Sequence, residues 1–525
     1  MGGPGACHTG AVPAPSPTPP LSPAGRATLI RLGFAAVVVA AIVGVLAVIT
    51  PARPAPAAAP DWPPTDVASG EGWVDPASAG QPWGDTVEGL LTFRGNPSRT
   101  WYGEGPVPTD PVRVWRYPDT AMCSSSVIQG VERDWCGTGW TGQPSVFEYD
   151  GRTWVLFGAY DRQLHFLDAD TGEQMIPSFE AGDLFKGSAT VDPDGYPIVY
   201  AGSLDNNLYA IAFDRDEPTV LWQYDSHQDV EPVWNDDWDA ASLVIDDYLF
   251  QGGENSHWFI WKLNRGYDDD GLATLDPELV FTAPGFDDEL LADLGQDNVS
   301  IESSVAISGD TIYFANSGGL VQGWDISGVG EGRDPERTFR FWTGDDTDAT
   351  VVIDDEGYLY VMVEVDRPTD RSDEIGQFLK LDPTRPDDPI VWSVHDPERS
   401  GVWATPAIHR DILIVPTDAG WVHGIDRATG EIRWRFFLYG PTWQSPVVVD
   451  DVLIQGDCRG GVLRGFDVSD TTVAPPQIWA IELGGCVEST PTVWQGRIYV
   501  GTRSGFFHAI AQRANEPIAD APGGR

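Results

Sequence analysis

The chain has 525 residues, and 79 Asp and Glu against 32 Lys and Arg give it a formal net charge of −47. A field of this sign repels phosphate backbones, so the composition excludes a nucleic-acid-binding protein. Hydrophobic residues make up 42% of the chain and include 22 Trp, 15 Tyr and 21 Phe, far more than a disordered polyanion carries. We therefore expect a large, acidic and aromatic-rich globular protein.

The N-terminal part differs in composition from the rest. Residues 1–26 consist mainly of Gly, Pro, Ala, Ser and Thr, which predicts a disordered tail. Leu32–Ile49 then runs for 18 residues without a charge, about 27 Å as a helix, close to the apolar thickness of a bilayer. Arg26 and Arg31 precede this run, and the positive-inside rule therefore keeps the N-terminus in the cytoplasm. We predict a transmembrane signal-anchor helix over 27–50 and an extracytoplasmic location for everything after it.

A cleaved signal peptide is the competing interpretation of the apolar run. Signal peptides have apolar regions of about 7–15 residues, shorter than this one, although Ala57–Ala59 offers small residues for cleavage. In either case residues 51–84, rich in Pro and Ala, are expected to form a linker between the membrane and the globular part.

Cysteine spacing agrees with export. Apart from Cys7, the cysteines form two local pairs, Cys123 with Cys136 and Cys458 with Cys486. In an exported domain such pairs predict two disulfides. A zinc site is the alternative, but no CxxC spacing or cluster of histidines supports it.

An internal repeat is the strongest signal in the sequence. Similar segments recur every 40 to 62 residues, and eight of them start at Gly142, Lys186, Ala240, Glu302, Asp348, Trp403, Trp443 and Glu488. Periods of this length indicate a propeller or a solenoid. Within a unit, short alternating runs such as Ile498–Gly501 are separated by Gly-bearing turns, as in antiparallel strands. Four strands per unit make one propeller blade, so we predict an all-β, eight-bladed β-propeller over 85–512.

The two ends of the repeat region are complementary. The eighth unit stops after its third strand at Ile510, and residues 513–525 are expected to be a disordered tail. The missing fourth strand has a candidate in Val112–Tyr117, which has the same Trp-centred pattern as the outer strands of other units. We predict that this N-terminal strand completes the last blade and so removes both open sheet edges.

The segments LDADTGE (167–173), IDRATGEIRW (425–434) and YVGTRSGFFHAI (499–510) resemble the pyrroloquinoline-quinone (PQQ) repeat of eight-bladed propellers. LTFRGNPSRTWYGEGPVP (91–108) is similar to the lead-in of exported bacterial PQQ-like repeat proteins. The turn residues of the repeat supply a tight hairpin, and Trp on the outer strand is expected to pack between blades. These residues have structural roles in the scaffold, so the resemblance is specific for the fold and says little about the function.

Two functions follow from this resemblance. The family's PQQ-dependent dehydrogenases, which oxidise alcohols or sugars, resemble one another in a vicinal cysteine pair, a catalytic Asp, and a calcium ion held by Glu, Asn and Asp. No adjacent cysteines occur in this chain. We therefore favour the other function, a membrane-anchored binding or scaffolding propeller that resembles the BamB-type assembly lipoproteins and has a protein or cell-envelope partner. No catalytic residue is assigned, PQQ is not favoured as a cofactor, and the dehydrogenase remains the alternative.

Candidate ligand-binding residues stand at equivalent positions at the start of the units. In a ring these positions face the mouth of the central channel, where polar and aromatic groups converge as a ligand site requires. The predicted rim consists of Lys186, Glu302, Asp348, Trp403, Trp443 and Glu488. The alternative is a solvated channel with no ligand.

An insertion in the third unit offers hard oxygen ligands of the kind that calcium prefers. The candidate calcium ligands are Asp268, Asp270, Asp276 and Glu278, around the turn at Gly271. The spacing departs from that of an EF-hand, and an acidic surface loop is the alternative. Residues 286–294 are expected to form a short helix.

Overall fold

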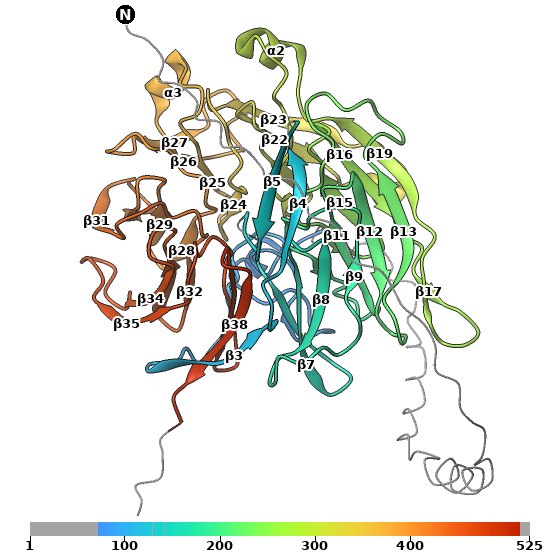
Figure 1. Cartoon of the computed structure of the whole chain (residues 1–525). Helices are drawn as coiled ribbons and strands as arrows, with labels where there is room; N and C mark the ends of the chain where they lie inside the picture. Colours follow the sequence, from blue (N-terminus) through green and yellow to red (C-terminus); the bar gives the residue numbers. More distant parts are fainter. Residues whose placement is uncertain (1–71, 129, 141, 515–525) are drawn as a thin grey trace, which may run out of the picture. The chain divides into compact units, whose positions relative to one another are not determined.

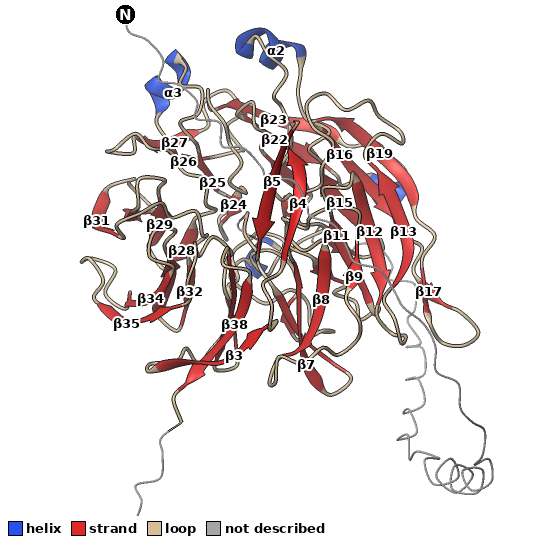
Figure 2. Ribbon diagram, viewed as in Figure 1, coloured by secondary structure: helices blue, strands red, loops and turns tan. Residues whose placement is uncertain are grey.

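The computed structural model describes residues 72–128, 130–140 and 142–514. Strands arranged around a centre are the main regular elements of this part, and its two α-helices are short (Figures 1 and 2). These are α2 (Asp288–Leu294) and α3 (Asp370–Ile375), and two 3₁₀ turns are η1 (Pro76–Ser78) and η2 (Val329–Glu331). The predicted anchor over 27–50 lies outside the described residues. Within them, no helix combines the length and the apolar character needed to cross a bilayer.

Eight radial sheets confirm the predicted number of blades. Blade 1 consists of β1 (Gly89–Leu90), β6 (Ser145–Tyr149), β7 (Arg152–Gly158), β8 (Gln163–Asp168) and β9 (Phe179–Glu180). Blade 2 consists of β10 (Thr190–Val191), β11 (Ile198–Gly202), β12 (Asn207–Ala212) and β13 (Thr219–Asp225), and blade 3 of β14 (Leu243–Ile245), β15 (Tyr248–Gly252), β16 (His257–Lys262) and β19 (Glu278–Pro284). Blade 4 consists of β20 (Ala306–Ser308), β21 (Thr311–Phe314), β22 (Leu320–Asp325) and β23 (Glu336–Trp342). Blade 5 consists of β24 (Val352–Ile353), β25 (Leu359–Met362), β26 (Phe378–Leu381) and β27 (Ile390–Val394). Blade 6 consists of β28 (Ala407–His409), β29 (Ile412–Pro416), β30 (Trp421–Asp426) and β31 (Ile432–Phe437), and blade 7 of β32 (Val447–Val449), β33 (Val452–Gly456), β34 (Val462–Asp467) and β35 (Gln477–Glu482). Blade 8 consists of β2 (Gly103–Glu104), β36 (Thr492–Trp494), β37 (Arg497–Thr502), β38 (Phe506–Gln512) and β3 (Pro111–Tyr117).

The predicted closure of the ring is confirmed. Strand β3 pairs antiparallel with β38, with Trp115 opposite Ala509, and so supplies the outer strand of blade 8. Both predicted disulfides are also present, Cys123–Cys136 and Cys458–Cys486. The first joins the base of a hairpin made by β4 (Cys123–Ile128) and β5 (Val131–Cys136).

The ring has two faces that are distinguished by their turns. The upper face, as we call it, carries the turns between the second and third strands of each blade and the connections between blades. The lower face carries the remaining turns. The β4–β5 hairpin, α2 and α3 all belong to the upper face; in Figure 1 the two helices lie at the top and the hairpin lies near the middle.

Helix α2 confirms the prediction for 286–294. Asp287 begins it, because its Oδ1 accepts a hydrogen bond from the backbone N–H of Leu290 at 2.9 Å. Hydrogen bonds from Arg340 hold the pKa of Asp287 below its usual range. Helix α3 was not predicted; Thr369 caps it in a reciprocal arrangement with Ser372.

The repeat motif has a clear packing role. In blade 1, Asp168 Oδ1 accepts hydrogen bonds from the backbone of Asp170 and Thr171, and Gly172 follows with a positive φ of 73°. A Cβ on Gly172 would lie 2.7 Å from the Trp115 ring of the preceding blade. Gly430 lies in the same way against Trp392, so this glycine is needed both for the turn and for the close approach of the indole.

The lead-in segment, residues 89–104, occupies the lower part of the central channel and bonds to every blade in turn. In Figure 1 this blue segment lies at the centre of the ring. Its ends form strands β1 and β2, which pair with β6 of blade 1 and β36 of blade 8. Backbone hydrogen bonds join it to blades 2, 4 and 5 through Val191, Ile307 and Ile353.

Two arginines of the lead-in segment complete the set of contacts. Arg99 donates to the carbonyl oxygen of Val305 in blade 4 at 2.8 Å and to that of Ala241 in blade 3 at 3.2 Å. Arg94 donates to the carbonyl oxygens of Pro406 and Pro446, which precede the first strands of blades 6 and 7. Both guanidinium groups are completely buried. The lead-in segment therefore plugs the channel from below.

Candidate functional site

The mouth of the channel on the upper face contains a buried lysine among carboxylates. The Lys186 Nζ lies 2.8 Å from Asp239 Oδ2, 3.7 Å from Glu254 Oε1 and 3.8 Å from Asp237 Oδ2. It also lies 4.4 Å from the centre of the Trp140 ring. Lys186 precedes blade 2, whereas its acidic partners come from the connection into blade 3 and a turn within that blade. Burial opposes the charged form, but the three carboxylates outweigh it and hold the pKa of Lys186 well above its usual value.

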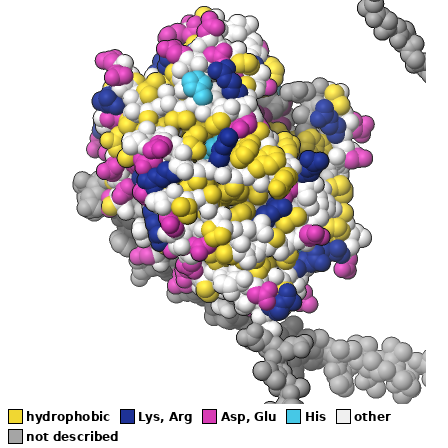
Figure 3. Space-filling model, turned by 90° about the vertical axis from the view of Figure 1, so that its left-hand side faces the viewer, with side chains coloured by type: hydrophobic (Ala, Val, Ile, Leu, Met, Phe, Trp, Pro, Cys, Tyr) yellow, Lys and Arg dark blue, Asp and Glu magenta, His cyan; other side chains and the backbone are white. Residues whose placement is uncertain are grey.

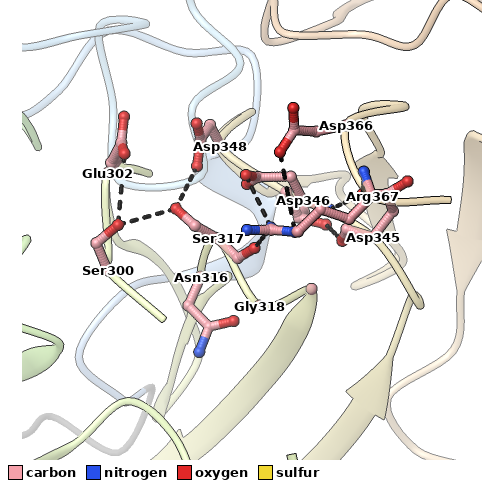
Figure 4. A network of polar contacts seen from close by, with 12 residues as sticks. Ser300, Glu302, Asn316, Ser317, Gly318, Asp345, Asp346, Asp348, Asp366 and Arg367 are labelled. Carbon is pink, nitrogen blue, oxygen red and sulfur yellow. Dashed lines mark hydrogen bonds and ion pairs between the residues drawn. The ribbon is translucent and has the colours of Figure 1, made fainter. Parts of the chain in front are cut away.

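A second acidic network continues this cluster around blades 4 and 5 (Figure 4). The Ser317 hydroxyl connects the two blades, because it donates to Asp348 Oδ1 at 2.9 Å and lies 2.9 Å from Ser300 Oγ. Ser300 in turn donates to Glu302 Oε1 at 3.4 Å. On the other side, Arg367 Nη2 donates to Asp346 Oδ2 at 2.9 Å.

The carboxylates of these two networks outnumber the cations. Burial, reinforced by neighbouring negative charge, raises the pKa of a whole set of them well above their usual range. The set consists of Glu254, Glu302, Asp346, Asp348 and Glu364. One buried oxygen each of Glu302, Asp346 and Glu364 has no hydrogen-bond partner. The mouth is therefore able to hold protons or other cations.

Indole rings fill the rest of the mouth. Trp140 meets Trp403 nearly edge-on, with ring centres 4.7 Å apart, and Trp403 meets Trp443 at 5.6 Å. Glu488 fixes Trp140, because the Glu488 carboxylate accepts a hydrogen bond from the backbone N–H of Trp140 at 2.8 Å. The same carboxylate pairs with Arg503 at 3.1 Å. Between the acids and these rings the cavity measures only about 30 Å³. That volume suits one or two water molecules.

The structure brings the six predicted rim residues to one mouth, but in separate groups. Lys186 belongs to the first acidic network, Glu302 and Asp348 to the second, and Trp403 and Trp443 to the row of indoles. Glu488 lies beside Trp140. Ligand binding by the rim remains a prediction.

Sequence reasoning missed half of the site. Asp237, Asp239, Glu254, Asp346 and Glu364 were not predicted, and neither was Trp140. A signal was present: an Asp-x-Asp pattern at 237–239 and at 346–348 ends three residues before the first strand of blades 3 and 5. The glutamates follow in the same blades, Glu254 after β15 and Glu364 after β25, in turns that do not belong to the repeated strand pattern.

The predicted calcium residues lie on a different part of the protein. Asp268 and Asp270 form the turn between β17 (Gly266–Tyr267) and β18 (Ala273–Thr274). Asp268 Oδ1 accepts hydrogen bonds from the backbone N–H groups of Asp270 and Leu272, as in a simple turn. Among the described residues, the groups of three converging metal-type ligands do not include Asp268, Asp270, Asp276 or Glu278. Calcium binding there remains a prediction.

A larger groove of about 510 Å³ lies on the lower face, between residues 79–105 and the turns of blades 5 to 7. Both of its arginines are paired with carboxylates. Arg427 lies 2.8 Å from Asp354 Oδ2, and Arg410 lies 2.6 Å from Asp451.

We predict that Lys186→Met destabilises the protein by about 2–3 kcal/mol at pH 8, because Asp239 and Glu254 lose their buried cation. At pH 5 we expect a smaller loss, because burial raises the pKa of Glu254 well above its usual value and its carboxylate then takes up a proton. Urea unfolding at the two pH values measures the difference, with Lys262→Met, at a partly exposed lysine of β16, as the control. An equal loss at both pH values would contradict this role of Lys186.

We also predict that stability falls as the pH rises. Burial raises the pKa of Asp237 and of Asp418 to about 7, from an ordinary 3.8. Between these values the folded chain binds more protons than the unfolded chain, so the free energy of unfolding decreases with pH by up to about 1.4 kcal/mol per unit for each such group. Asp418→Asn should flatten the profile, whereas Asn at the exposed Asp119 should not. If Asp418→Asn leaves the pH dependence of the free energy of unfolding unchanged, the pKa of Asp418 is not raised in the folded chain.

Comparison with known proteins gives one family match and several similar folds. Residues 380–474 match the family model described as outer membrane protein assembly factor BamB. No curated protein matches the sequence. The solved structure of quinohemoprotein alcohol dehydrogenase from Comamonas testosteroni is 13% identical, with 82% of each chain covered and a TM-score of 0.53. Sqt1 from Saccharomyces cerevisiae is 10% identical over 69% of this chain and 93% of its own, with a TM-score of 0.50.

BamB from Moraxella catarrhalis is 14% identical over 78% of this chain and 99% of its own, with a TM-score of 0.35. At these identities the alcohol dehydrogenase and Sqt1 structures show the fold alone. Together with the eight sheets they show an eight-bladed β-propeller, and the family match places a BamB-like, PQQ-type repeat at residues 380–474.

Proposed function

We propose that this protein is a membrane-tethered, extracytoplasmic binding module that holds a protein partner on the outside of its propeller. The lead-in segment closes the channel from below, and the acidic networks and indoles fill its mouth. A closed channel leaves the outer surface as the place where binding can occur. The two disulfides support an oxidising compartment, and the apolar run at 32–49 supports the tether.

The residues at the mouth do not fit a quinone cofactor. Pockets for ligands of that size measure roughly 300–1,000 Å³, whereas this cavity measures about 30 Å³. Trp140 and Trp403 meet edge to face and leave no flat slot between parallel rings. The geometry therefore does not support the dehydrogenase alternative.

The observation that carries the proposal is an apolar area on the outer side of blades 5 to 7, which we call the outer face. Figure 3 shows hydrophobic side chains gathered across the middle of this side, between charged groups. Of the ten large hydrophobic residues that are exposed in the described part of the chain, five belong to these three blades: Val391, Phe437, Tyr439, Val473 and Ile478. Gathered apolar exposure of this kind is typical of interaction sites.

Aromatic and arginine side chains extend the outer face along blade 6. The rings of Trp421 and Phe437, and those of Phe437 and Tyr439, each lie 5.1 Å apart. The Arg435 guanidinium covers the Trp421 ring at 4.3 Å. Trp, Tyr and Arg are the residue types that contribute most to protein–protein binding energy, and the tyrosine is 71% exposed.

A photo-crosslinking amino acid at Ile478 tests the proposal in the producing cells. The matched control is Val220, because both are the second residue of an outer strand and have similar exposure, 42% and 37%. We expect a defined protein adduct from position 478 that position 220 does not give, and we expect Tyr439→Ala to weaken it. Equal adducts from both positions, or none from 478, would overturn the proposal.

A further inference from the structure

A histidine occupies the third residue of the third strand in blades 1, 6 and 8. These residues are His165, His423 and His508, and each is at most 1% exposed. Strand register confirms that the positions correspond, because they pair with Phe157, Val415 and Val500 near the end of the second strand. The repeat therefore allows three chemically identical side chains to be compared in one position.

The surroundings of two of these histidines are accounted for by the fold. In blade 1 the His165 Nε2 lies 3.2 Å from Asp161, and its Nδ1 lies 2.9 Å from Ser178 Oγ. In blade 8 neither nitrogen of His508 has a partner, and burial with help from Arg113 and Arg116 lowers its pKa to about 3. His508 is therefore a neutral ring in a cationic surrounding, which repels a metal ion.

His423 in blade 6 is different, because acids surround it without forming hydrogen bonds to it. Neither ring nitrogen has a hydrogen-bond partner, although the side chain is completely buried. Asp396 and Glu398, from the connection between blades 5 and 6, offer carboxylate oxygens, and with a ring nitrogen these ligand atoms all lie within 4.8 Å of one another. A cation bound between these groups would give the unpartnered nitrogens of this buried imidazole and the two carboxylates a common partner.

The two carboxylates are held in place by their own partners. Asp396 is 1% exposed, and its Oδ2 accepts hydrogen bonds from the Ser400 N–H at 2.6 Å and from the Ser400 hydroxyl at 2.8 Å. Glu398 accepts a hydrogen bond from Arg435 at 2.7 Å through Oε1, which leaves Oε2 for another ligand. The Glu398 side chain is 28% exposed, so an ion can reach the site from solvent. Such outer contacts are what orients metal ligands in known sites.

We propose that Asp396, Glu398 and His423 bind one divalent transition-metal ion of the Zn²⁺ type. One imidazole and two carboxylates suit Zn²⁺ or Co²⁺, and a water molecule would complete four-coordination. A ring nitrogen of His423 without a hydrogen-bond partner is able to ligate, and the two acids balance the charge of the ion. The ion would fix the start of the 396–406 connection to strand β30. Trp403 of the channel mouth lies further along the same connection. This inference does not depend on the proposed function.

The test measures metal binding by the full chain, purified in mild detergent and stripped with a chelator. Zn²⁺ content after dialysis against micromolar Zn²⁺ gives the stoichiometry, and visible absorption after adding Co²⁺ reports nitrogen and oxygen ligands. We expect one ion per chain in the wild type. His423→Asn and Glu398→Gln should each weaken Zn²⁺ affinity by at least about 10–100-fold, the range for losing a supporting group.

His508→Asn is the matched control, since it changes a buried, unpartnered histidine at the same position of another blade and should leave affinity unchanged. Circular dichroism checks that each variant folds. If His423→Asn fails to fold, Glu398→Gln decides, because its side chain is partly exposed. The proposal is overturned if the wild type binds no Zn²⁺, or if folded Glu398→Gln binds it as tightly as the wild type.

Discussion

Replacing Arg99 by Ala is expected to lower the free energy of unfolding by about 4–5 kcal/mol, which makes it the most destabilising substitution that we predict in the lead-in segment. The Arg99 side chain donates to the carbonyl oxygens of Val305, Phe93 and Ala241 and to the Thr92 hydroxyl. Truncation leaves these buried acceptors without a donor and opens a cavity in the middle of the channel. Urea unfolding followed by tryptophan fluorescence measures the loss.

Two further substitutions separate the causes. Burial lowers the pKa of Arg99 to about 9, so the charge itself is unfavourable in the folded chain. Arg99→Met removes the charge and keeps most of the volume, and should therefore be less destabilising than Ala. Arg513→Ala, which removes an exposed pair with Asp110, should change stability by less than about 0.5 kcal/mol. If Arg99→Ala and Arg513→Ala have similar effects, the lead-in segment does not plug the channel.

Trp115→Ala is expected to destabilise the protein by about 3–5 kcal/mol and, in addition, to promote association between chains. Trp115 closes the ring: its Nε1 donates to the Ala169 carbonyl oxygen in blade 1 at 3.0 Å, and its ring packs on Gly172. Without these contacts β3 keeps its backbone pairing with β38 and the smaller contacts made by Arg116 and Tyr117. Loss of β3 would expose an unpaired sheet edge, which is a site of aggregation.

Trp392→Ala is the matched control for ring closure. Trp392 makes the equivalent contact in blade 5, where its Nε1 donates to the Arg427 carbonyl oxygen at 3.0 Å and its ring packs on Gly430. Both variants should lose similar thermal stability, but only Trp115→Ala should elute as larger species in size-exclusion chromatography below its unfolding temperature. Identical elution of the two variants would argue against a special role for β3.

The fold was predictable because each blade repeats a local pattern. Turns such as 168–172 and Trp-centred outer strands recur along the chain, and the unpaired ends of the first and last units determine how the ring closes. The plug was not predictable in the same way. Residues 91–102 have no strand or helix period, and the partners of Arg94 lie 312 and 352 residues away in the sequence.

The candidate site was predictable only in outline. Positions that follow the repeat, such as Lys186 and Glu302, were placed at the mouth because every blade begins there. Their partners depend on contacts between neighbouring blades: Glu254 reaches Lys186 from a turn, and Trp140 covers it from an irregular connection. Periodicity gives no information on such turns and connections, so these partners became visible only in the structure.

The central claim is that the channel is closed at both ends and that the protein acts through its surface. Titration of the full chain with PQQ in the presence of Ca²⁺, followed by tryptophan fluorescence, tests it most directly because Trp140, Trp403 and Trp443 surround the mouth. A quinone-binding dehydrogenase serves as the positive control. We predict no saturable quenching. Saturable one-to-one binding that is lost in Trp403→Ala would contradict the closed channel.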